Sequence, residues 1–140
     1  MNFFQKATAG IVVGIVLGMG FYGYKVSHPP TRSFAPFVGV TRIKVFDTQG
    51  NATVINDPSR IASICTFVNR YANQWGGTGD LFGVPLPGVK ADFSAGPVFL
   101  GHFGVGANFF ETQRDGDFAS HSASASEVST FYRLVGGAKL

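Results

Sequence analysis

Histidine, cysteine and carboxylate side chains are the groups through which this 140-residue chain could bind a metal or transfer protons. His102 and His121 fall in neighbouring β-type runs, with Asp115 and Asp117 between them. Their spacing matches neither the paired ligands of zinc sites nor the ligand array of an EF-hand loop. We therefore predict no metal site, and keep a weak Zn²⁺ or proton-linked site at His102 and His121 as the minor alternative.

Nucleophilic catalysis has no recognisable signature in this sequence. No G-x-S-x-G elbow occurs, and Cys65 lies on the apolar stripe of a predicted helix, where a free thiol behaves as a small hydrophobe. The stretch 101–106, GHFGVG, departs from the G-x-G-x-x-G nucleotide-binding pattern, so we expect its glycines to mark bulges or close packing beneath aromatic rings. The sequence predicts no catalytic residue and no cofactor, and favours a protein that is not an enzyme.

The composition favours one membrane segment attached to a small domain. Hydrophobic residues make up 45% of the chain, charged residues 14%, and the mean hydropathy is +0.19. From residue 38 onward there are eight Lys and Arg and eight Asp and Glu, so the formal net charge of +3 comes from residues 1–37. A nucleic-acid partner needs clustered cations on the domain. We therefore exclude that partner and assign the basicity to membrane flanks.

The segment 7–24 carries no charge and has the length of a membrane-spanning helix. As a helix its 18 residues reach about 27 Å, close to the ~30 Å hydrocarbon core of a bilayer. Aromatic residues and the cations Lys6 and Lys25 flank it, as in interfacial belts. We predict a short tail (1–6) and an uncleaved signal-anchor helix (7–25). The alternative is a secreted soluble factor, released by cleavage near Gly20.

Three glycines recur at four-residue spacing in this segment. Gly10, Gly14 and Gly18 advance only ~40° per step on a helix and so form one groove. Small residues let membrane helices approach closely, which indicates packing on a second copy or on a partner's helix. The alternative is that glycine is simply common in membrane helices.

The orientation of the segment follows from weak charge asymmetry. The short tail with Lys6 favours a cytoplasmic amino end, although Lys25 and Arg32 nearly balance it. We expect a single-pass protein of the bacterial inner membrane, with its carboxyl-terminal domain periplasmic or extracellular.

A proline-rich linker (26–37) and a small α+β domain (38–140) are expected to follow. Alternating runs, turn signals and two helix caps predict the order ββαββββα, an antiparallel sheet packed by two helices on one side. The cap signals are Asp57-Pro58 for a helix ending near Trp75, and the Ser124–Glu127 capping box for a helix stopped by Gly136.

The loop 75–88 is the predicted interaction surface, because it is long, rich in Gly and Pro, and apolar. Trp75, Phe82 and Leu86 are its candidate contact residues. The alternative is that these side chains plug one end of the core. The favoured function is a membrane-anchored, non-catalytic accessory or interaction domain in contact with the lipid bilayer. The other candidate is a small extracytoplasmic hydrolase or ligand-binding domain that uses this loop and the His102 face.

Overall fold

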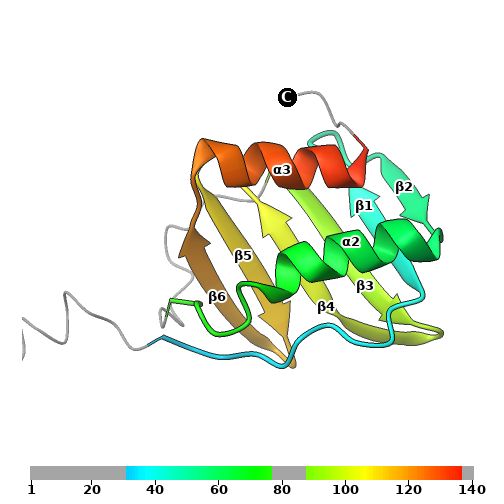
Figure 1. The fold of residues 1–140 in the computed structure, drawn as a ribbon, viewed down its shortest axis with the longest axis horizontal. Coiled ribbons are helices and arrows are strands. Elements are labelled where there is room, and N and C mark those ends of the chain that lie inside the picture. Colours follow the sequence, from blue (N-terminus) through cyan, green and yellow to red (C-terminus); the bar gives the residue numbers. More distant parts are fainter. Residues whose placement is uncertain (1–30, 77–87, 137–140) are drawn as a thin grey trace, which may run out of the picture. The chain divides into compact units, whose positions relative to one another are not determined.

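The computed structural model describes residues 31–76 and 88–136 (Figure 1). The strands are β1 (Arg42–Phe46), β2 (Ala52–Ile55), β3 (Val89–Ala95), β4 (Val98–Val105), β5 (Phe109–Arg114) and β6 (Asp117–Ser122). The helices are α2 (Pro58–Asn69) and α3 (Ala125–Val135).

All six strands form one antiparallel sheet in the order β2-β1-β3-β4-β5-β6. Tight turns join the strands of each hairpin, and α2 carries the chain from β2 at the edge back to β3 on the other side of β1. This α+β architecture and its element order confirm the prediction for the described residues.

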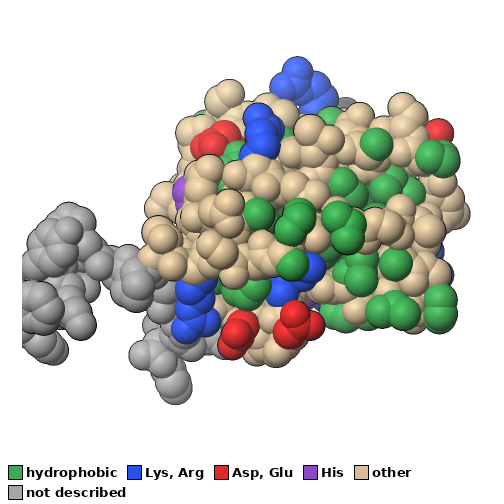
Figure 2. Space-filling model, turned by 60° about the horizontal axis from the view of Figure 1, so that its bottom comes forward, with side chains coloured by type: hydrophobic (Ala, Val, Ile, Leu, Met, Phe, Trp, Pro, Cys, Tyr) green, Lys and Arg blue, Asp and Glu red, His purple; other side chains and the backbone are tan. Residues whose placement is uncertain are grey.

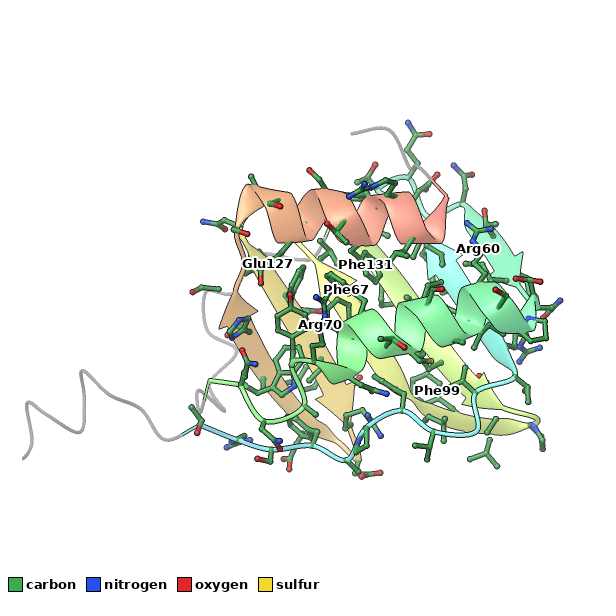
Figure 3. All side chains as sticks on the ribbon, in the orientation of Figure 1. Arg60, Phe67, Arg70, Phe99, Glu127 and Phe131 are labelled. Carbon is green, nitrogen blue, oxygen red and sulfur yellow. The ribbon has the colours of Figure 1, made fainter. Side chains whose placement is uncertain are left out.

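Both helices lie across the same face of the sheet and enclose the core (Figure 1). Alternate residues of each strand point to this face, as the pleat requires. An aromatic cluster fills its centre, with ring centroids 5.0–5.8 Å apart for Phe103 with Phe110, Phe103 with Phe131, and Phe67 with Phe110. Figure 3 shows Phe67 of α2 and Phe131 of α3 pointing toward each other. Large aromatic side chains thus supply much of the buried area of a small core.

Helix α2 begins at the predicted residue but ends earlier than predicted. Asp57 accepts a hydrogen bond from the Arg60 backbone N–H, and Pro58 is the first helical residue. The prediction that α2 runs to Trp75 was wrong, because the α-helix ends at Asn69. Tighter turns follow, in which Tyr71 N–H donates to the Val68 carbonyl, and they direct Tyr71 into the core.

Local signals set both ends of α3 as predicted. The Ser124 hydroxyl accepts from the Glu127 backbone N–H, and the Glu127 carboxylate accepts from the Ser124 N–H. Gly136 follows the last turn with a φ of 102°, the left-handed conformation that glycine adopts without strain.

Residues 31–37, assigned above to the linker, lie along the domain. The Phe34 N–H donates to the Ala72 carbonyl, and the Phe37 N–H donates to the Asn69 side chain. The Phe37 ring is 4% exposed and stacks on Phe93, with centroids 4.1 Å apart. Residues 31–37 therefore pack on the domain and belong to the same compact unit as the sheet and helices.

Among residues 31–76 and 88–136 no helix is long and apolar enough to cross a membrane. The predicted tail and signal-anchor helix (1–25) lie outside these residues, as do the glycines at 10, 14 and 18.

Candidate functional site

The sheet face turned away from the helices carries a polar cluster of Lys90, Asp92, His102 and Glu111. Asp92 of β3 is the cross-strand partner of His102 of β4, and Glu111 of β5 is the partner of Gly104, two residues along the same face. Because side chains alternate along a strand, all four project to this face. Strand pairing thus brings two carboxylates to either side of one histidine.

His102 is the buried centre of the polar cluster. It is 8% exposed, and its Nε2 atom lies 3.7 Å from Glu111 Oε1 while the Phe118 ring packs beside it. Lys90 Nζ is 3.5 Å from Asp92 Oδ1. Among the residues that the structure describes, neither His102 Nε2 nor Asp92 Oδ1, both buried, has a hydrogen-bond partner. The cluster thus offers polar atoms that a ligand with matching donors and acceptors could hydrogen-bond.

Two nucleophile candidates lie away from His102. Cys65 belongs to α2 on the opposite side of the sheet, and burial raises the pKa of its thiol, which keeps it protonated. Ser120 of β6 is the cross-strand partner of Glu111, so two strand spacings, roughly 10 Å, separate it from His102. Neither residue can form a nucleophile–base pair with His102 in this arrangement.

The two histidines proposed as a minor zinc or proton-linked site are not brought together. His121 pairs with Phe110 and faces the helices, where it lies against Tyr71 and its Nδ1 atom is 2.9 Å from the Gln74 carbonyl. His102 faces the other side of the sheet. Among the described residues no three His, Cys, Asp or Glu side chains are grouped so that they could hold a metal ion.

Gly101 and Gly106 of the 101–106 stretch lie in close packing, as predicted for the glycines of this stretch. Gly101 has a φ of 140° next to a register shift between β3 and β4, and a Cβ there would lie 2.5 Å from the Gln113 carbonyl oxygen. A Cβ on Gly106 would overlap the Phe109 ring. A larger side chain at Gly101 would be strained by its φ and by the backbone contact, and one at Gly106 would require the Phe109 ring to move.

Trp75 is the one candidate of the 75–88 loop that the structure describes. It is 2% exposed, packs edge-on against Phe103 at 5.9 Å, and exchanges backbone hydrogen bonds with Arg32. Trp75 is therefore part of the core, which agrees with the structural alternative for this residue and not with an exposed contact residue. Phe82 and Leu86 lie outside the described residues.

A hollow of about 320 Å³ opens between the start of α2, the end of α3 and the β1–β2 turn. Its charged groups already have structural partners. Arg60 Nε donates to the Leu134 carbonyl at the end of α3, and Asp47 accepts hydrogen bonds from Gln49 and Asn51. The Asn51 side chain, with backbone donors, holds the pKa of Asp47 below its ordinary value. We infer that the groups around this hollow stabilise the end of α3 and the β1–β2 turn, and we assign no ligand to it.

A second distinctive surface, the apolar end, consists of Val38, Val98 and Phe99. These residues are 70%, 57% and 57% exposed. Figure 2 shows hydrophobic side chains gathered over one half of the face that it presents, and Figure 3 places Phe99 below α2 near the β3–β4 turn. Sequence reasoning missed this surface because Val38 and Phe99 are far apart in the chain. The uncharged runs 33–41 and 93–101 were the available signal.

No protein-family model matches this chain, and no curated protein and no solved structure matches it either.

Proposed function

We propose that the protein is a membrane-anchored, non-catalytic accessory or interaction module, with its α+β domain held outside the cytoplasm. The observation that carries the proposal is the uncharged 18-residue run 7–24, flanked by aromatic residues and by Lys6 and Lys25. A helix of this composition is more stable in lipid than in water.

Two features of the described domain bear on this proposal. The polar cluster has a histidine and two carboxylates but no Ser or Cys within hydrogen-bond reach of His102 among the described residues, so the nucleophile–base geometry of hydrolases is not formed there. The surface also exposes three large hydrophobic side chains near the β3–β4 turn, which suits contact with another surface.

Partner binding in the membrane is assigned to the glycine groove at Gly10, Gly14 and Gly18. Gly14→Ile is expected to abolish self-association or partner co-purification in mild detergent, because the larger side chain separates the helix backbones. Gly20→Ile is the matched control, since position 20 lies about 200° from Gly18 around the helix. Equal association of both variants and the wild type would refute the groove.

Anchoring is tested on the full-length chain in membranes washed with alkaline carbonate. The protein is expected to stay in the pellet at its full mass. A full-length protein released to the supernatant contradicts the anchor, and a product that begins at Phe21 supports the secreted-factor alternative. A reporter fused after Leu140 is expected to be active only outside the cytoplasm.

A ligand-binding domain is the second candidate, favoured by the buried His102 Nε2 and Asp92 Oδ1 atoms, which have no hydrogen-bond partner within the described part of the chain. A ligand with both a donor and an acceptor would satisfy these two atoms. Native mass spectrometry of the purified full-length chain separates the candidates. A retained protein partner supports the interaction module, and a retained small molecule lost in His102→Ala supports ligand binding.

A further inference from the structure

The apolar end is formed by two chain segments that contain no charged residue, 33–41 and 93–101. Backbone and side-chain hydrogen bonds hold them together. The Thr41 N–H donates to the Ser94 carbonyl at 2.9 Å, and the Gly96 N–H donates to the Thr41 hydroxyl at 2.8 Å. Val38 therefore stands next to the β3–β4 turn that carries Val98 and Phe99. Four large hydrophobic residues are exposed in the described part of the chain, and three of them lie here.

The three side chains are held in their exposed positions by a rigid base. Beneath Val38, the Phe37 ring stacks on Phe93 at an interplanar angle of 21°, and the Arg114 guanidinium lies 3.9 Å from the Phe37 centroid. Beneath Phe99, the register shift after Phe93 sets the direction of the strand. Because the core below is already filled, these residues stay at the surface.

Cations border the apolar end. Arg42 is exposed and lies in the same cross-strand row as Ser94 and Phe99. Arg114 lies against Phe37, the residue before Val38, and donates a hydrogen bond to the Ala35 carbonyl. Apolar side chains bordered by arginines match the bilayer interface, where acyl chains meet anionic phosphate groups.

The exposed area favours lipid over a stable protein partner. One Phe and two Val side chains at these exposures present on the order of 300 Å². A stable protein interface buries ~800 Å² on each partner. An isolated patch of this size is too small for a lasting dimer, whereas a side chain at a bilayer interface gains from burial one residue at a time.

We propose that Val38, Val98 and Phe99 insert into the headgroup region of the membrane that holds the protein, with Arg42 contacting lipid phosphate. This rests on the proposed membrane anchor. Residues 25–30 separate the predicted apolar run from Thr31, and six residues span at most about 20 Å. A tether of this length keeps the domain beside the bilayer, where a weak contact is formed at high effective concentration.

The test uses the full-length chain in vesicles of phosphatidylcholine and phosphatidylglycerol. Cys65→Ala removes the native thiol, and Val98→Cys carries an NBD fluorophore. We expect a blue-shifted NBD emission that is quenched by a shallow nitroxide-labelled lipid. Ser126→Cys, exposed at the start of α3, is the matched control and is expected to show neither effect. Phe99→Asp should abolish the quenching at residue 98, Phe99→Leu should retain it, and the emission of buried Trp75 reports that both variants fold.

Each outcome decides the proposal. Unquenched emission at residue 98 in a protein that resists carbonate washing overturns lipid contact and leaves the anchor intact. A concentration-dependent blue shift without quenching by the nitroxide lipid identifies a second copy as the occupant, and also overturns it. If carbonate washing releases the full-length protein, the proposed membrane anchor is wrong. In that case, quenching at residue 98 by added vesicles would support lipid contact without an anchor. The absence of such quenching would overturn both the anchor and the lipid contact.

Discussion

The hydrogen bond between Tyr71 and Glu127 predicts a specific acid sensitivity of the fold. Tyr71 follows α2 and Glu127 begins α3, and the tyrosine hydroxyl donates to the carboxylate at 2.8 Å (Figure 3 labels Glu127 at the start of α3). The Ser124 backbone and hydroxyl also donate to this carboxylate. These hydrogen bonds, the Ser124 backbone first, lower the pKa of Glu127 from 4.5 to about 2. Burial and the same bond raise the pKa of Tyr71 to about 12.

The sign of the pH effect follows from the lowered pKa. An unfolded chain binds the Glu127 proton near pH 4.5, while the folded chain resists it until about pH 2. The stabilisation is therefore complete above pH 4.5 and is lost as the pH falls toward 2. Without any screening by water, the difference between these two pKa values would correspond to roughly 3 kcal/mol of stability. Because the Glu127 carboxylate lies close to solvent and water screens its charge, we expect only part of this, about 1–2 kcal/mol.

Glu127→Gln is the perturbation, because glutamine keeps the shape and the capping acceptor but loses the charge. We expect a loss of about 1–2 kcal/mol in the free energy of unfolding at pH 7, and a smaller loss of stability between pH 4.5 and 2 than in the wild type. Urea unfolding of the full-length chain in detergent, followed by the fluorescence of Trp75, measures both. Tyr71→Phe should cost about 1–2 kcal/mol. Tyr132→Phe removes a hydroxyl from another buried tyrosine and is its matched control.

A double-mutant cycle completes the test. Tyr71→Phe combined with Glu127→Gln should cost less than the sum of the single losses, because the two groups share one bond. An additive cycle, or an unchanged acid profile in Glu127→Gln, would refute the assignment.

Two further predictions concern the packing of the sheet. Phe37→Ala is expected to lower the free energy of unfolding in urea by about 3 kcal/mol, because the buried Phe37 ring stacks on Phe93. Val38→Ala, at an exposed position, should change it by no more than about 0.5 kcal/mol. Equally small losses in both variants would mean that residues 31–37 do not pack on the domain. Gly101→Ala is expected to lower the free energy of unfolding by about 2–4 kcal/mol, because a Cβ at a φ of 140° meets the Gln113 carbonyl and Arg114. Gly50→Ala is the control: its φ is 82° but the space around it is open, so the loss should be about 1 kcal/mol. Equal melting temperatures of these two glycine variants would contradict the close approach at Gly101.

Features determined by neighbouring residues were predictable from the sequence. The Asp57 cap and the Ser124–Glu127 capping box join groups three residues apart, and the Asp115-Gly116 turn needs only two residues with positive φ. The burial alternation of β3, with Val89, Ala91 and Phe93 inward, repeats at the period of a pleated strand. These features depend on short loops of chain, so their entropic cost and their geometry can be read locally.

Features that join distant residues required the tertiary structure. The packing of residues 31–37 on β3 depends on Phe93, and the bond from Tyr71 to Glu127 spans 56 positions. The histidine faces depend on strand register: a shift of one residue reverses a side chain's face, and His102 and His121 are separated by a whole strand. The sequence by itself determined the caps, the turns and the order of the elements. Which side chains meet was decided only when the strands paired, because register is a property of two segments and not of either alone.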